Sequence, residues 1–168
     1  GMVLLRNKNH TLPIELSASK RPTILVVGEN AIKMMTVGGG SSSLKAKYEI
    51  SPLRGIQERA GNMANVQYVR GYVGDIGGEY NGVTTGQSLQ DDRTPEQLTA
   101  EAVEAAKKAD YVIFVGGMNK AHHQDCEDGD RLHYELPYGQ DQPISAHAAV
   151  NNRVIYVSNS GNAHGMPW

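Results

Sequence analysis

The sequence contains a single cysteine, Cys126, so it cannot form an internal disulfide or a zinc site with several cysteine ligands. No apolar run approaches the roughly 20 residues that a helix needs to cross a bilayer. Neither sign of charge dominates, because 16 Lys and Arg face 18 Asp and Glu for a formal net charge of -2. No basic patch for nucleic acid follows from that balance. The composition therefore argues against membrane and nucleic-acid partners, while one thiol does not distinguish cytoplasm from periplasm.

The length of 168 residues, 39% of them hydrophobic, suits one domain with a sizeable core. We interpret residues 1–20 as a linker arm that packs on the domain, and their opening apolar segment is too short for a signal peptide. The chain stops at its only tryptophan, Trp168, a residue that usually needs neighbours to cover it. We therefore expect residues 21–168 to be a domain truncated in its C-terminal part, and the chain to be a piece of a longer protein.

Three runs rich in β-branched residues predict buried strands, at 23–28, 111–115 and 153–158. A fourth strand is predicted at 66–69. Predicted helices lie between the strands, at 52–60, from Thr94 to 109, and at 140–151. Ser51, Pro52 and Gly61 mark the ends of the first helix, and Thr94, Pro95 and Gln97 form a capping-box pattern at the second. This alternation predicts an α/β fold with a mostly parallel, doubly wound sheet.

Two glycine-rich loops interrupt the pattern. Residues 38–43, Gly-Gly-Gly-Ser-Ser-Ser, could form an anion-binding concavity from successive backbone amides, and a flexible loop is the alternative. Residues 70–93 are polar and show no period, which indicates an ordered functional loop or a lid.

The segment 118–142 carries the densest chemistry. It follows the most apolar run, 111–115, so its polar residues should emerge at the carboxyl edge of a strand, where open α/β sheets bind ligands. Residues 122–131 alone hold two histidines, four acids, an arginine and the only cysteine. We interpret this segment as an active-site loop.

Eight short patterns occur along the chain in a fixed order: 2–7 with 12–14, 27–31, 38–42, 51–56, 104–110, Cys126-Glu127 with Asp130-Arg131, 136–140, and Gly161 with 166–168. In this order they resemble the C-terminal α/β sandwich domain of family 3 glycoside hydrolases, the β-glucosidase and β-xylosidase family. The resemblance covers essentially the whole chain. It implies a three-layer α/β sandwich and the hydrolysis of terminal β-linked sugars with retention of configuration.

Retaining glycosidases use two carboxyl groups about 5 to 5.5 Å apart, a nucleophile and a general acid/base. The resemblance implies that the nucleophile lies on a separate (β/α)8 barrel and the acid/base in a Glu-Gly-x-Asp-Arg motif of this domain. By position that acid/base is Glu127. Here Asp128 separates Glu127 from Gly129, so Asp125 is kept as the substitute.

Neighbouring residues receive supporting roles. Asp125, Asp128 and Asp130 would raise the pKa of Glu127 if they share its site, as a general acid requires. His123, with His122 beside it, and Asp125 are candidate substrate-binding residues, although surface histidines without a role are the alternative. We expect Arg131 to pair with Asp130. The spacing does not indicate a zinc site, and no cofactor is implied.

The implied partners are a β-linked oligosaccharide or glycoside and the barrel of the parent chain. A barrel needs about 200 residues or more, so none fits beside the sandwich and the fragment should be inactive alone. An exposed sheet edge could pair two copies. The resemblance implies a periplasmic or secreted parent.

Three alternatives compete with this interpretation. A nucleotide-binding module is disfavoured because no Gly-x-Gly-x-x-Gly follows the strand at 23–28. A cysteine hydrolase using Cys126 with His122 or His123 is disfavoured because the surrounding acids should raise the thiol pKa. A non-catalytic accessory or ligand-binding α/β module remains the main alternative.

Overall fold

The computed structural model describes residues 1–36, 40–42, 44, 46–74, 79–80, 83–84, 87–121, 123–127 and 129–168. Its strands are β1 Thr23–Val27, β2 Asn65–Val69, β3 Glu79–Tyr80, β4 Val83–Thr84, β5 Tyr111–Gly117 and β6 Val154–Asn159. Its α-helices are α1 Pro52–Ala60, α2 Pro95–Ala106 and α3 Asp141–Val150. Short 3-10 turns are η1 Lys8–His10, η2 Glu29–Ala31, η3 Gly40–Ser42, η4 Gly61–Met63 and η5 Pro137–Gly139.

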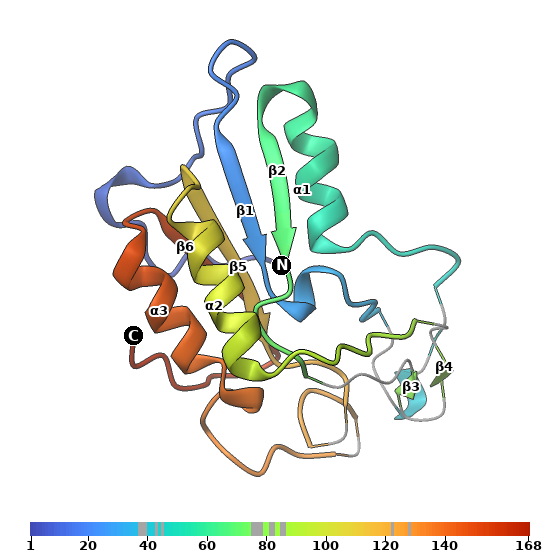
Figure 1. Ribbon diagram of the computed structural model, residues 1–168. Helices are drawn as coiled ribbons and strands as arrows, with labels where there is room; N and C mark the ends of the chain where they lie inside the picture. The colour runs from blue at the N-terminus through green and yellow to red at the C-terminus, as the bar shows by residue number, and fades with distance from the viewer. Residues whose placement is uncertain are drawn as a thin grey trace.

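Four parallel strands form the central sheet in the order β2-β1-β5-β6. Helix α1 covers one face, and α2 and α3 cover the other (Figure 1). The prediction of a three-layer α/β sandwich with a doubly wound sheet is therefore confirmed. Because the strand order reverses between β1 and β5, the ends of these two strands form the crevice where such sheets bind ligands.

The two faces of β1 and β5 build separate cores. Leu25, Val27, Val112 and Phe114 face α2 and α3, while alternate residues such as Val26 pack toward α1. This even alternation, with both faces buried, explains why the two strands read as continuous apolar runs.

Local capping sets the starts of the first two α-helices. The Ser51 side chain accepts a hydrogen bond from the backbone N–H of Arg54 at 3.3 Å. Thr94 and Gln97 form the predicted capping box, with distances of 2.9 and 3.2 Å. Both predicted helix starts are confirmed, because each cap depends only on residues three positions apart.

Strand β6 departs from the prediction of a third buried strand. Its residues are half-buried or exposed, and Val157 is 37% exposed. The reason is its place at the edge of the sheet, where only β5 pairs with it. An apolar sequence alone does not distinguish an edge strand from a central one.

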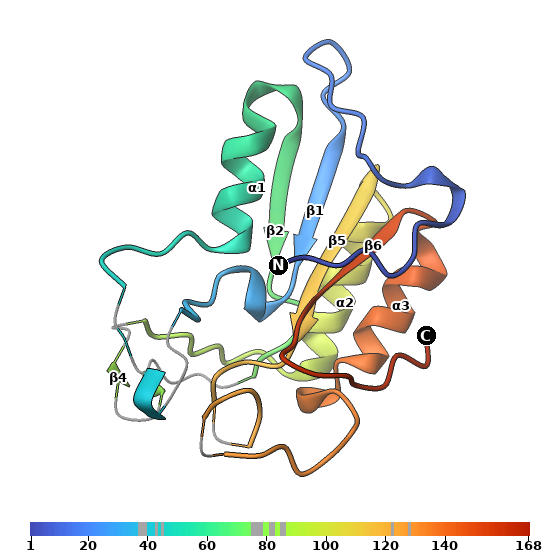
Figure 2. The same cartoon turned by 180° about the vertical axis from the view of Figure 1, so that it is seen from behind.

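The N-terminal arm crosses the sheet face opposite α2 and α3, over β5 and β6 (Figure 2). Ile14 and Leu16 pack against the core on that face, and the Ser17 N–H donates to the Met63 carbonyl at 3.1 Å. Residues 2–5 are exposed.

Part of the predicted loop or lid at 70–93 lies outside the described residues, as does part of 38–43. Across the described part of the chain, no helix is long and apolar enough to cross a membrane. That part also contains no group of three or more His, Cys, Asp and Glu that could hold a metal ion.

Candidate active site

The segments after β1 and β5 meet at the carboxyl edge of the sheet (Figure 1). Gly28 makes this possible, because a Cβ there would lie 2.1 Å from the Val115 carbonyl oxygen and its φ is +118°. The loop at 118–142 begins at this point, as the sequence predicted, and it lies beside the turn at residues 29–31.

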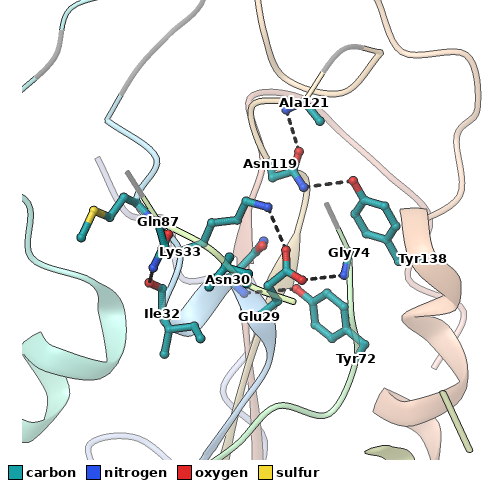
Figure 3. A network of polar contacts seen from close by, with 12 residues as sticks. Glu29, Asn30, Ile32, Lys33, Tyr72, Gly74, Gln87, Asn119, Ala121 and Tyr138 are labelled. Atoms are coloured by element: carbon teal, nitrogen blue, oxygen red, sulfur yellow. Dashed lines mark hydrogen bonds and ion pairs between the residues drawn. The ribbon is translucent and has the colours of Figure 1, made fainter. Parts of the chain in front are cut away.

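A buried ionic network underlies the meeting point (Figure 3). The Glu29 carboxylate accepts from Lys33 Nζ at 2.8 Å and from Arg70 Nη2 at 2.9 Å. It also accepts from the Gly74 N–H at 2.6 Å. The Glu29 and Lys33 side chains are fully buried, and Arg70 is 7% exposed and donates to the Leu89 carbonyl at 2.6 Å. One carboxylate therefore ties together the segments that follow β1 and β2.

Hydrogen bonds beside this network hold the start of the 118–142 loop. Asn30 Nδ2 donates to the Met118 carbonyl at 2.9 Å. Asn119 Nδ2 donates to the Tyr138 hydroxyl at 3.1 Å (Figure 3). The Gln140 side-chain amide closes the loop, since it accepts from the Gly117 N–H at 2.9 Å and donates to the Gly117 carbonyl at 2.8 Å. The two ends of the loop are thus held to the end of β5.

Asp125 holds the middle of the loop in place. Its N–H donates to the Asn119 carbonyl at 3.1 Å, and its own carbonyl accepts from Lys120 Nζ at 2.9 Å. The Asp125 carboxylate accepts from the Gly161 N–H, beyond β6, at 2.5 Å. This side chain joins the loops after β5 and β6, and its contact with a sugar stays a prediction.

Glu127 lies exposed at the surface of the loop, facing the glycine-rich segment after β1. Ser41 Oγ is 2.9 and 3.0 Å from its two carboxylate oxygens, and the Ser42 N–H donates from 3.3 Å. These hydrogen bonds, from Ser41 first, lower the pKa of Glu127 below its ordinary value. We expected neighbouring acids to raise that pKa. The Asp125 carboxylate is turned toward Gly161, and Asp128 lies outside the described residues.

This contact involves part of the segment 38–43, whose backbone amides we expected to bind an anion. Of that segment, residues 40–42 are described, and the anion that Ser41 and Ser42 bind is a side chain of the same protein.

Arg131 does not pair with Asp130, which corrects our expectation. Its Nη2 donates to the Ala163 carbonyl at 2.7 Å, and its guanidinium lies 5.9 Å from the centre of the Tyr134 ring. The acceptor for Arg131 is thus a backbone carbonyl in the segment after β6 and not the neighbouring acid Asp130. The position therefore joins two loops, as Asp125 does.

The remaining candidates occupy the same loop. His123 is exposed at φ +63°, with its Nδ1 3.0 Å from the Asp130 carbonyl oxygen, and its contact with a sugar stays a prediction. Cys126 is half-buried and forms an isolated β-bridge with Gly129. His122 lies outside the described residues.

An open hollow of about 420 Å³ lies between this loop and the segment after β6. It is lined by Asp130, Arg131, Leu132, His133, Tyr134 and Asn162. The Tyr134 side chain is 59% exposed there.

Sequence reasoning missed Glu29, Lys33 and Arg70. One signal was available: an acid directly after a buried strand, followed by a lysine four residues later, in Gly-Glu-Asn-Ala-Ile-Lys. That spacing suits an ion pair on one turn of helix. No local signal connects Glu29 with Arg70, because they lie 41 positions apart in the sequence.

The fold and loop together define a parallel α/β sandwich domain with an ionisable loop at its topological switch point. The sequence profile described as "Glycosyl hydrolase family 3 C-terminal domain" matches residues 2–168. The chain belongs to this family, as the resemblance implied.

Similar proteins include Beta-glucosidase BoGH3A of Bacteroides ovatus, which is 42% identical over 177 residues covering 100% of this chain and 22% of that protein. A β-glucosidase of Bifidobacterium adolescentis has a similar crystal structure, with 27% identity and a TM-score of 0.70 over 97% of this chain and 20% of that one. A β-glucosidase of Kluyveromyces marxianus in complex with glucose shares the fold at 17% identity and a TM-score of 0.80, over 99% and 36% of the two chains. The chain spans about a fifth of the length of the curated relatives it matches.

Proposed function

We propose that this chain is the domain of a retaining β-glycosidase that supplies the general acid/base, and that Glu127 is that residue. The observation that carries the proposal is the position of Glu127: an exposed carboxylate on the loop after β5, at the switch point of a family 3 domain. Glycosidic oxygen is a poor leaving group until it is protonated, and an exposed carboxyl at a domain surface can reach a sugar held by another domain.

The nucleophile belongs to the proposed (β/α)8 barrel of the parent protein. Two carboxyl groups about 5 to 5.5 Å apart are required, and Glu127 would provide one of them. A terminal β-linked glucoside or related glycoside would be bound between the two domains. His123 and Asp125, on the same loop, are our candidates for contact with it.

Glu127→Gln in the full-length protein tests the assignment. We expect kcat/KM for an alkyl β-glucoside to fall about 10²- to 10⁴-fold, the usual contribution of a general acid. An aryl glycoside with a strongly acidic leaving group needs little protonation, so its glycosylation step should be affected far less. With this aryl glycoside, azide should restore turnover by Glu127→Gln, because azide attacks the glycosyl-enzyme without a general base.

Glu135→Gln is the matched control, because Glu135 is an exposed acid on the same loop. The 168-residue chain alone should give no turnover of either substrate, since one carboxyl cannot serve as both nucleophile and acid/base. Equal activity of Glu127→Gln and the unaltered protein on the alkyl glycoside would reject the assignment. That result would favour the accessory-module alternative.

A further inference from the structure

Ser41 and Glu127 form a contact between the two loops of the switch point. They are 86 positions apart in the sequence, and the hydroxyl of Ser41 lies 2.9 and 3.0 Å from the two carboxylate oxygens. Its single proton is therefore shared between both oxygens. The Ser42 N–H and hydroxyl approach one of these oxygens at 3.3 and 3.4 Å.

All of these groups act as donors to the carboxylate, so they favour its charged form. The pKa of Glu127 is lowered chiefly by the Ser41 hydroxyl, with the backbone amides of Ser41 and Ser42 adding to the effect. Two charged residues in the described part of the loop point elsewhere: the Asp125 carboxylate accepts from the Gly161 N–H, and Lys120 Nζ donates to the Asp125 carbonyl. Neutral donors from the loop after β1 therefore stabilise the charge.

The proposed reaction needs Glu127 in two protonation states. In the first step its carboxyl proton passes to the glycosidic oxygen and the alcohol leaves; in the second its carboxylate takes a proton from the attacking water. A serine hydroxyl suits both states, because it can donate to a carboxylate and, after rotation, accept from a carboxylic acid. A backbone N–H such as that of Ser42 can only donate.

We propose that Ser41 is a positioning residue for Glu127, holding its carboxylate in the charged, proton-accepting state and keeping contact with it in both steps. The inference rests on the proposed function of Glu127 as the acid/base. Ser41 would thereby join the loops after β1 and β5 at the reacting carboxyl group. It is not consumed in the reaction.

The contact can be tested in the 168-residue chain without any activity. The side-chain carboxyl resonance of Glu127, assigned with Glu127→Gln, is followed by NMR as the pH changes. We expect Ser41→Ala to raise the pKa of Glu127 toward its ordinary value, and Ser41→Thr, which keeps the hydroxyl, to restore it. Ser145→Ala is the control, since Ser145 Oγ donates within α3 to the Asp141 carbonyl. An unchanged titration in Ser41→Ala, with folded spectra for all variants, would overturn the inference.

The role in the reaction is tested in the full-length protein through the pH profile of kcat/KM. A raised pKa keeps the acid protonated to higher pH, so Ser41→Ala should shift the alkaline limb of the kcat/KM profile to higher pH. Ser41→Thr should shift it back to the position seen in the unaltered protein. Activity of Ser41→Ala that falls equally at every pH would overturn the role. Failure of the acid/base assignment can be distinguished from failure of this inference, because Glu127→Gln tests that assignment separately. If the assignment failed, the NMR shift would still establish the contact between Ser41 and Glu127.

Discussion

Replacing Glu29 by Gln should destabilise the domain more than any other single loss of charge among its described ion pairs. The substitution keeps the volume but removes the charge that accepts from Lys33, Arg70 and the Gly74 N–H. One carboxylate oxygen of Glu29 is also replaced by an NH2 group, which then faces a donor. Breaking a buried ion pair by removing one partner costs about 3–5 kcal/mol, because the remaining charge stays buried.

Urea unfolding followed by far-UV circular dichroism measures this loss as a change in the free energy of unfolding. For a domain with about 5–15 kcal/mol in total, the midpoint should fall steeply. Glu58→Gln is the matched control: Glu58 pairs with Arg54 at 2.7 Å, but the side chains are 54% and 64% exposed. Removing that pair should cost less than about 1 kcal/mol. If the two variants lose equal stability, the buried network does not have the energetic role that we infer.

Two further predictions concern the core and the end of β5. Burial lowers the pKa of His147, whose Nδ1 lies 2.5 Å from the Pro143 carbonyl oxygen. The stability that His147 contributes is therefore complete above the ordinary histidine pKa of about 6.5 and is lost as the pH falls below that value, by at most about 1.4 kcal/mol per pH unit. In His147→Leu, the free energy of unfolding measured in urea should change less with pH between about pH 7 and 5. An unaltered pH dependence would contradict this. Gly117→Ala should cost at least about 2 kcal/mol in the same assay, because its Cβ would lie 2.3 Å from the Asn159 carbonyl oxygen at φ +101°. Gly139→Ala, at φ +63° with nothing within 4 Å, should cost only about 1 kcal/mol, and equal losses would exclude the steric cause.

The features that the sequence predicted well are those determined by near neighbours. The start of α1 depends on Ser51 and Arg54, and that of α2 on Thr94 and Gln97, so the caps could be recognised from spacing alone. The doubly wound sheet followed from alternating strands and helices, because parallel strands require long crossovers. The loop at 118–142 was placed correctly at the carboxyl edge for the same reason.

The features that it did not predict depend on residues far apart in the chain. Glu29 is buried because Arg70, 41 residues later, returns to the same point, and the partner of Glu127 lies 86 residues before it. Arg131 likewise bonds to Ala163 rather than to the acid beside it. Each contact exists only after the sheet has brought separate loops to one edge. The resemblance implied a role for Glu127 but did not indicate what surrounds it.

The amide of Gln140 imitates an adjoining strand where β5 ends, because it satisfies both the N–H and the carbonyl of Gly117. These two hydrogen bonds hold the two ends of the segment 118–139 together, whatever residues lie between those ends. Insertions or deletions between residues 118 and 139 could then reshape the exposed surface of the loop without disturbing the sheet or α3. The sequence of this exposed surface could therefore vary at little cost to folding.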